Sequence, residues 1–167
     1  MTQEVKRSYL EMNSIQDLEE VQKPSVDYSI NLLDPINFQL NKFFYKNIGK
    51  KHRWVDRLVW MESKWIDYVS DKKVKTYVFK HKNDLAGFFE LIFHFEKKEV
   101  EIAYFGLLEE FQNKKLGSYL LSEAIKISFE NNINRVWLHT CSLDHKNALN
   151  NYISRGMKIF KSEIVII

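Results

Sequence analysis

The sequence has little cysteine and no long apolar run. Its single cysteine, Cys141, cannot form an intramolecular disulfide and offers no CxxC pair for zinc. No stretch approaches the ~20 apolar residues that a membrane span needs. These absences exclude a disulfide framework, a zinc-ribbon type of site and a spanning helix, so we expect no metal and no membrane partner.

Targeting patterns and linkers are also missing. Residues 1–7 are mixed polar and charged with no apolar stretch behind them, so we read no leader peptide and expect a cytoplasmic protein. There are no repeats or linker-like tracts, and the only prolines, Pro24 and Pro35, lie in the N-terminal part. A chain of 167 residues is the length of one domain. We therefore predict a single domain over residues 1–167, with residues 1–25 as an N-terminal extension packed on it.

An excess of charge of one sign is absent as well. The 25 basic and 22 acidic side chains leave a formal charge of +3, which suits an anionic ligand but does not indicate a nucleic-acid surface. The lysines of interest are scattered over turns and strand ends, which is typical of a solvated face. They are Lys72, Lys73, Lys75, Lys80, Lys82, Lys114 and Lys115. We do not expect nucleic acid as a partner.

Hydrophobic periodicity predicts strands and helices in one α/β arrangement. The predicted strands are 5–12, 26–33, 74–80, 86–95, 100–108, 135–141 and 157–167, and the predicted helices are 35–47, 62–69, 116–130 and 145–155. The three central strands should form an antiparallel meander, and the helix 116–130 should be a crossover between two parallel strands. We expect an α/β sandwich with a mixed sheet.

The dipeptide Asp34-Pro35 predicts where the first helix begins. Aspartate is a favoured N-cap, and proline is favoured at the first helical position because its missing N–H is not needed there. We therefore expect this helix to start at Pro35 and to end near Gly49.

The segment 105–118 joins a predicted strand to a predicted helix and is the most informative part of the chain. The first turn of a helix presents unpaired N–H groups and the positive end of the macrodipole, so an anion bound there gains several hydrogen bonds. Lys114 and Lys115 add positive charge, and Gly117 has no Cβ to keep a phosphate away from the backbone. The segment predicts a diphosphate-binding turn.

Here the chain resembles the GNAT superfamily of acyl-CoA-dependent N-acetyltransferases, whose signature Q/R-x-x-G-x-G/A also follows a strand and opens a helix. Gln112 and Gly117 match two of its three fixed positions, whereas Lys115 stands where the family usually has glycine. Residues 137–156 extend the resemblance, and the aromatic stretch 54–60 resembles one uncharacterised bacterial subgroup. The resemblance implies a GNAT-like acyl-CoA N-acyltransferase fold, a mixed, mostly antiparallel sheet of about six to seven strands with about four helices.

The resemblance also implies acetyl-CoA as cosubstrate, in a V-shaped splay that maps to 101–108 and 135–141. Gly106 fits a bulge there, although a close packing contact would explain a glycine equally well. Lys115 can still offer its N–H if its backbone is right-handed helical. The implied cofactor-binding residues are Phe105, Gly106, Leu107, Gln112, Asn113, Lys114, Lys115, Leu116, Gly117, Ser118 and Asn147. For Asn147, an ordinary helix cap is the alternative.

Direct acyl transfer requires a neutral amine, so a base must take a proton from the acceptor. The resemblance places this base at Glu101, and Glu90 competes because a carboxylate among aromatics is costly unless it is paired or functional. His139 is a third candidate, with a structural role as its alternative. Tyr152 matches the family position that protonates the departing thiolate, although its apolar helical stripe would also pack against the sheet.

The sequence leaves the acceptor, a small-molecule or peptide amine, unidentified. Aromatic residues that could form a partly apolar acceptor pocket are Phe43, Phe44, Tyr45, Trp54, Trp60 and Trp65. Cys141 near His139 could serve as a nucleophile, but nothing in its context activates it, and a buried small apolar role is the alternative. A non-catalytic acyl-CoA-binding or regulatory module is the alternative to an enzyme, and a homodimer is compatible with the sequence.

Overall fold

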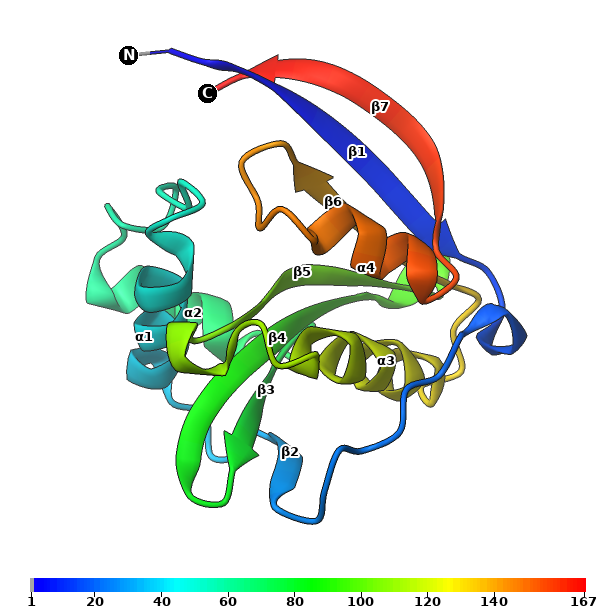
Figure 1. The fold of residues 1–167 in the computed structure, drawn as a ribbon. Helices are drawn as coiled ribbons and strands as arrows, with labels where there is room; N and C mark the ends of the chain where they lie inside the picture. The colour runs from blue at the N-terminus through cyan, green and yellow to red at the C-terminus, as the bar shows by residue number, and fades with distance from the viewer. Residues whose placement is uncertain (1) are drawn as a thin grey trace.

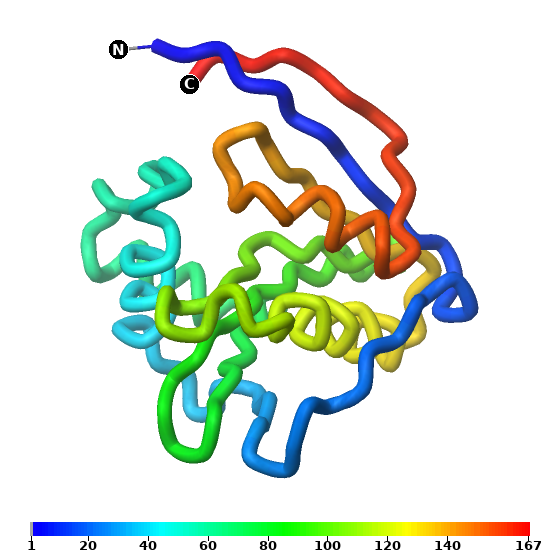
Figure 2. The backbone as a smooth tube through the Cα atoms, in the orientation of Figure 1, coloured from blue at the N-terminus to red at the C-terminus, as the bar shows by residue number. Residues whose placement is uncertain are grey.

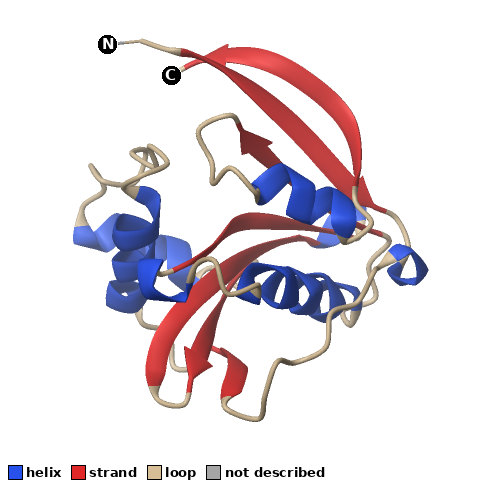
Figure 3. Ribbon diagram, in the orientation of Figure 1, coloured by secondary structure: helices blue, strands red, loops and turns tan. Residues whose placement is uncertain are grey.

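The computed structural model describes residues 2–167 and contains one seven-stranded sheet (Figures 1 and 3). The strands are β1 (Glu4–Met12), β2 (Tyr28–Leu32), β3 (Val74–His81), β4 (Asp84–His94), β5 (Glu99–Leu107), β6 (Arg135–Cys141) and β7 (Lys158–Ile166). Their order is β2-β3-β4-β5-β6-β1-β7, and only β5 and β6 are parallel neighbours. The predicted mixed sheet and its central meander are confirmed.

Four helices cover the sheet. They are α1 (Phe38–Gly49), α2 (Glu62–Ser70), α3 (Leu116–Phe129) and α4 (Ala148–Ser154). Successive residues of a strand point to opposite faces, so neighbours in β3 show which helix packs where. Val78 clusters with Phe44 of α1, whereas Phe79 clusters with Leu120 of α3. The sheet therefore separates α1 from α3, and in residues 2–167 no helix has the length and apolarity of a membrane span.

Two helices begin later than the sequence predicts. The N-cap of α1 is Asn37 rather than Asp34, and its side-chain oxygen accepts a hydrogen bond of 3.1 Å from the Leu40 N–H. Asparagine and aspartate cap equally well, so local preference did not decide between them. Before α4, the Asn147 N–H donates to His145 Nδ1 at 3.1 Å, and this turn replaces the predicted first helical turn.

The bulge in β5 lies at Ala103, so the prediction of a bulge at Gly106 is wrong. The pairing of β4 with β5 shifts register and leaves Ala103 unpaired between Ile102 and Tyr104. Gly106 keeps a regular partner, and a Cβ added there would lie 2.6 Å from Ile48 Cγ2. The packing alternative is therefore correct, because glycine lets α1 approach β5 closely.

The parallel pair of β5 and β6 holds together only near the start of each strand. Across the described chain, pairing begins at Glu99 with Arg135 and stops at Glu101 with Trp137. Helix α3 provides the predicted crossover between the two strands. Beyond Glu101 the two strands separate, as the predicted splay requires.

Strand β1 is an internal strand, although it comes from the segment expected to be an extension. It pairs antiparallel with β6 on one side and with β7 on the other. Gln3 and Ile167 exchange two backbone hydrogen bonds of 2.8 and 2.9 Å, so the two ends of the chain lie side by side (Figure 2). Val5, Leu10 and Met12 are buried, which fixes β1 in the core.

Candidate active site

A cavity of about 1050 Å³ opens where β5 and β6 separate. Its walls come from β5, β6, the starts of α3 and α4, and the loop between α1 and α2. A smaller recess of about 500 Å³ adjoins it and shares Asp56, Arg57 and Tyr104 with it. Every cofactor-binding residue predicted from the sequence lines the large cavity except Lys114.

The loop between β5 and α3, predicted to bind a diphosphate, forms one end of this cavity. Helix α3 begins at Leu116, and no side chain caps its first N–H groups, so these donors can serve a ligand. The Gln112 side chain donates a hydrogen bond of 3.1 Å to the Leu107 carbonyl. The Ser118 hydroxyl donates one of 2.9 Å to the Lys115 carbonyl. These bonds tie the loop to the end of β5 and to the first turn of α3.

Lys115 has a left-handed backbone, with φ 64° and ψ 16°. The right-handed conformation considered for it is therefore not adopted. This region favours glycine, the residue that the GNAT signature usually has here. The chain keeps the backbone shape that suits glycine while carrying a lysine side chain.

Gly117 lies open to the cavity rather than under close packing. A Cβ added to Gly117 would have its nearest neighbour, Asn151 Nδ2, at 3.7 Å, which is an ordinary contact. The same amide donates a hydrogen bond of 3.2 Å to the Gly117 carbonyl and so links α4 to the start of α3. The fold therefore tolerates a side chain at Gly117, and a methyl group there would lie at the turn predicted to bind a diphosphate.

Lys114 and Asn147, two of the residues predicted to bind the cofactor, differ in their relation to the cavity. Lys114 does not line the cavity, and its Nζ lies 5.5 Å from the centroid of the Phe111 ring. Asn147 lines the cavity and makes no side-chain capping bond at the start of α4. Asn147 therefore occupies the N-cap position, as the capping alternative expected, but its side chain is not engaged in capping.

Tyr152 of α4 forms part of the cavity wall and is 8% exposed. Its ring centroid lies 6.4 Å from that of Phe105, so it also packs, as its helical stripe predicted. Burial, with a smaller contribution from the charge of Asp144, raises the pKa of the Tyr152 hydroxyl above its ordinary value. The hydroxyl therefore stays protonated at neutral pH and can donate a hydrogen bond into the cavity.

Two of the three bases predicted from the sequence, Glu101 and His139, line the cavity, and its other carboxylates and imidazoles belong to Asp56, Asp144, His52 and His145. Glu101 Oε1 lies 3.3 Å from His94 Nε2, and the Glu101 side chain is 17% exposed at the point where the strands separate. Burial and the positive charge of Arg7 lower the pKa of His139, which favours its neutral imidazole at pH 7. His139 therefore belongs to the cavity wall rather than to the core.

Glu90, the competing base, does not line either cavity. It is fully buried, and its carboxylate accepts hydrogen bonds from Arg57 at 2.8 and 2.9 Å, from Tyr68 at 2.8 Å and from Asn41 at 3.0 Å. Taking a proton would break this buried ion pair. A carboxylate among aromatics had to be paired or functional, and the structure shows that Glu90 is paired.

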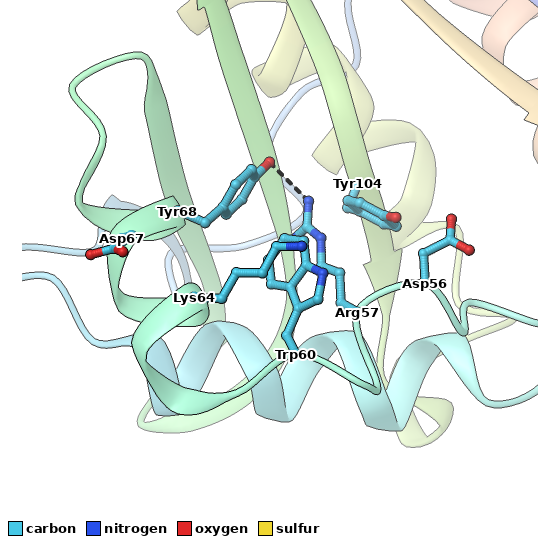
Figure 4. Close-up of a pocket in the computed structure, with 7 residues that line it drawn as sticks. All are labelled: Asp56, Arg57, Trp60, Lys64, Asp67, Tyr68 and Tyr104. Carbon is cyan, nitrogen blue, oxygen red and sulfur yellow. Dashed lines mark hydrogen bonds between the residues drawn. The ribbon is translucent and has the colours of Figure 1, made fainter.

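Arg57, the partner of Glu90, fills a cage of aromatic rings beside the smaller recess (Figure 4). The centroids within 4.2 to 5.9 Å of its guanidinium carbon belong to Tyr45, Trp60, Trp65, Tyr68 and Tyr104. Desolvation opposes its charge, but the hydrogen bonds and charge of Glu90 prevail and raise the pKa of Arg57. No local pattern in the sequence identifies Arg57, although a buried Glu90 requires a cation and this requirement points to such a partner.

The aromatic residues proposed for an acceptor pocket divide between site and core. Trp54 lines the large cavity and Trp60 lines the smaller recess. Phe44, Tyr45 and Trp65 are buried in the core, and Phe43 is 39% exposed at the surface. Helical spacing alone could not make this distinction, because core and pocket residues share it.

Cys141 is half-buried and lines the cavity. Burial raises the pKa of its thiol, so the thiolate that a nucleophile requires is disfavoured at neutral pH. The Asp144 carboxylate accepts hydrogen bonds from the Thr140 hydroxyl and from the Cys141 N–H, which shapes the turn after β6. Among residues 2–167, no group of three or more His, Cys, Asp or Glu side chains could hold a metal ion.

Comparison with solved structures shows the same fold in proteins of low identity. A protein of unknown function from Staphylococcus epidermidis matches with a TM-score of 0.67 and 18% identity, over 99% of this chain and 62% of that one. A GCN5-related N-acetyltransferase from Sphaerobacter thermophilus matches with a TM-score of 0.73 and 11% identity, over 97% and 50%. The chain thus spans about half to three fifths of the length of these two proteins.

A spermidine N-acetyltransferase from Vibrio cholerae, solved with CoA and spermine, matches with a TM-score of 0.65 and 16% identity, over 86% of this chain and 96% of that one. At these identities the likenesses show the fold alone. Comparison with curated protein sequences gives no match. The family model described as "Acetyltransferase (GNAT) family" matches residues 37–157, from the N-cap of α1 to the residue before β7. The chain therefore belongs to the GNAT acetyltransferase family, and its fold is the GNAT acyl-CoA N-acyltransferase fold.

Proposed function

We propose that the protein transfers an acetyl group from acetyl-CoA to the primary amine of a small molecule or peptide by direct attack on the thioester. One observation carries the proposal. A single cavity is lined by the anion-binding start of α3, by the separated strands β5 and β6, and by the proton acceptor Glu101. A phosphate-binding turn alone suits many ligands, whereas a turn that shares a cavity with a base and a neutral phenol suits acyl transfer.

The residues present fit a CoA ester. The diphosphate would lie against the uncapped N–H groups at Leu116 and Gly117, at the positive end of α3. The backbone of β5 beyond Glu101 has no pairing with β6 in the described chain, so it can pair with the pantetheine amides as with an added strand. When bound, the cofactor supplies an activated acyl group and a thiolate as leaving group.

Glu101 would prepare the acceptor for attack. An alkylammonium ion has no lone pair, so it must lose a proton before its nitrogen can attack the acyl carbon. Glu101 would take this proton directly or through water, and the neutral imidazole of His139 is the second group placed to do so.

Tyr152 would assist departure of the leaving group. As the bond between the acyl carbon and sulfur breaks, negative charge develops on sulfur, and a protonated hydroxyl in the cavity wall can donate to it. On becoming an amide the ammonium group loses two protons, one before the attack and one as the tetrahedral intermediate collapses. The thiolate takes up one of them and the other passes to solvent, so the transfer needs no further reactant.

A non-catalytic acyl-CoA-binding module is the second candidate, favoured by the Lys115 side chain in the anion-binding loop. The two candidates separate in an assay of thiol release from acetyl-CoA with amino acids, polyamines, aminoglycosides and peptides. For an enzyme, we expect Tyr152→Phe to lower kcat about tenfold or more while the Kd for CoA stays within about twofold. Tight CoA binding without turnover on any of these amines would favour the binding module.

A further inference from the structure

Arg7 is a cation in the cavity wall, and one of its donors has no partner in the described chain. It lies on β1, outside the residues 37–157 that match the family model, and lines the large cavity. Its Nε is buried and has no hydrogen-bond partner in residues 2–167. Arginine rarely leaves a buried donor unpaired, because the lost hydrogen bond to water is then not replaced.

The nearest carboxylate does not satisfy Arg7. Glu163 Oε1 lies 4.0 Å from Arg7 Nη1, which is beyond hydrogen-bond length. The same carboxylate already accepts a hydrogen bond of 2.8 Å from the Tyr9 hydroxyl and has Lys161 Nζ at 3.6 Å. The Arg7 guanidinium therefore keeps donors in a planar fork, the arrangement that binds carboxylate or phosphate groups best.

Strand register places Arg7 and Glu101 at different positions along β6. Glu101 is opposite Trp137 of β6, whereas Arg7 is opposite Cys141 of the same strand. Four residues separate these positions along β6, about 13 Å at 3.3 Å per residue, and because β6 lies between β5 and β1 two strand spacings add about 10 Å across the sheet. An acceptor with its amine at Glu101 could therefore place a second group at Arg7 only if several bonds separate the two.

We propose that Arg7 binds an acid group of the acceptor, so that the substrate class is a primary amine carrying a carboxylate or phosphate several atoms from its nitrogen. This inference rests on the proposed acetyl transfer and goes further, because it names the acceptor class and a specificity-determining residue. A polyamine, which would bring another cation to Arg7, is disfavoured as the acceptor.

The test compares acceptors that share an amine and differ in the far group. They are 6-aminohexanoate, its neutral amide, 5-aminopentyl phosphate and 1,5-diaminopentane, each assayed for CoA release. We expect kcat/KM for one of the acids to exceed that for the amide and the diamine about tenfold or more, and Arg7→Met to remove this preference. The acid with the higher kcat/KM, 6-aminohexanoate or 5-aminopentyl phosphate, shows whether Arg7 binds a carboxylate or a phosphate.

Matched variants separate recognition from folding. Lys6→Met removes an exposed neighbouring cation on β1 and should leave the preference unchanged, whereas Arg7→Lys keeps the charge but not the fork and should retain only part of it. Equal kcat/KM for acid and amide, an equal loss on both in Arg7→Met, or weaker CoA binding by Arg7→Met would overturn the inference.

A binding measurement keeps the test decisive if no amine is acetylated. Ligand-observed NMR follows 6-acetamidohexanoate and 5-acetamidopentyl phosphate with the CoA-loaded protein. CoA binding without turnover would count against the proposed enzyme alone. Binding of either acetylated acid by the wild type and its loss in Arg7→Met would still support the role of Arg7, whereas no binding, or equal binding by both proteins, would overturn it.

Discussion

Removing the charge of Glu90 should destabilise the fold strongly. In Glu90→Gln, Arg57 would remain 5% exposed without a neutralising carboxylate, and the bonds from Tyr68 and Asn41 would weaken. Breaking a buried ion pair by removing one partner costs about 3–5 kcal/mol. In a domain of this size each kcal/mol shifts Tm by about 2–4 °C, so we expect Tm to fall by roughly 6–20 °C.

The double variant Arg57→Met with Glu90→Leu separates charge from packing. Apolar residues of similar volume often replace a buried ion pair at little cost, although here the aromatic cage also loses cation–π contacts worth about 2 kcal/mol. The double variant should therefore be more stable than Glu90→Gln alone. Urea unfolding followed by tryptophan fluorescence, together with thermal melts, gives both free energies of unfolding.

An exposed ion pair provides the control for these measurements. Lys51 and Glu109 lie 2.6 Å apart with side chains 57% and 68% exposed, so Lys51→Met should not change Tm measurably. The reasoning is refuted if Glu90→Gln melts within about 2 °C of the wild type, or if the double variant is no more stable than the single one.

Three further predictions concern single positions. Gly106→Ala should lower the free energy of unfolding by about 1–3 kcal/mol in urea titrations, because its Cβ would meet Ile48, and the loss should be smaller when Gly106→Ala is made in an Ile48→Ala background. Gly117→Ala should leave Tm unchanged but weaken CoA binding about tenfold in calorimetry, since the new methyl group enters the anion-binding turn; equal affinity would contradict that placement. Arg7→Met should raise the pKa of His139 in an NMR titration, because the Arg7 charge lowers it; an unchanged or lower value would contradict this.

Local sequence pattern was sufficient for most of the elements. Strand β6 has the predicted bounds 135–141, and α2 and α3 end within a residue of their predictions, because apolar periodicity is repeated over several turns or pleats. The strand-to-helix junction at Gln112 to Gly117 was also readable, since it depends on local spacing. Element boundaries that depend on a single capping residue, such as the start of α1, could not be predicted from the sequence.

Local sequence patterns could not predict which residues far apart in the chain are in contact. Glu90 was correctly identified as a group that needs a partner, but the partner Arg57 is brought to it by the loop between α1 and α2. The position of the bulge depended on how β4 and β5 align over their whole length, and Gly106 was set by the approach of α1. No local propensity contains this information.

The sequence by itself determined the order of the elements and the strand-to-helix junction before α3, because periodicity and the spacing from Gln112 to Gly117 are properties of neighbouring residues. Only the tertiary structure decided that β1 enters the sheet between β6 and β7, that Lys115 takes a left-handed backbone, and that Arg7 reaches the cavity. These three features depend on which distant strands pair and which faces are buried, and such long-range contacts form only when the whole domain folds.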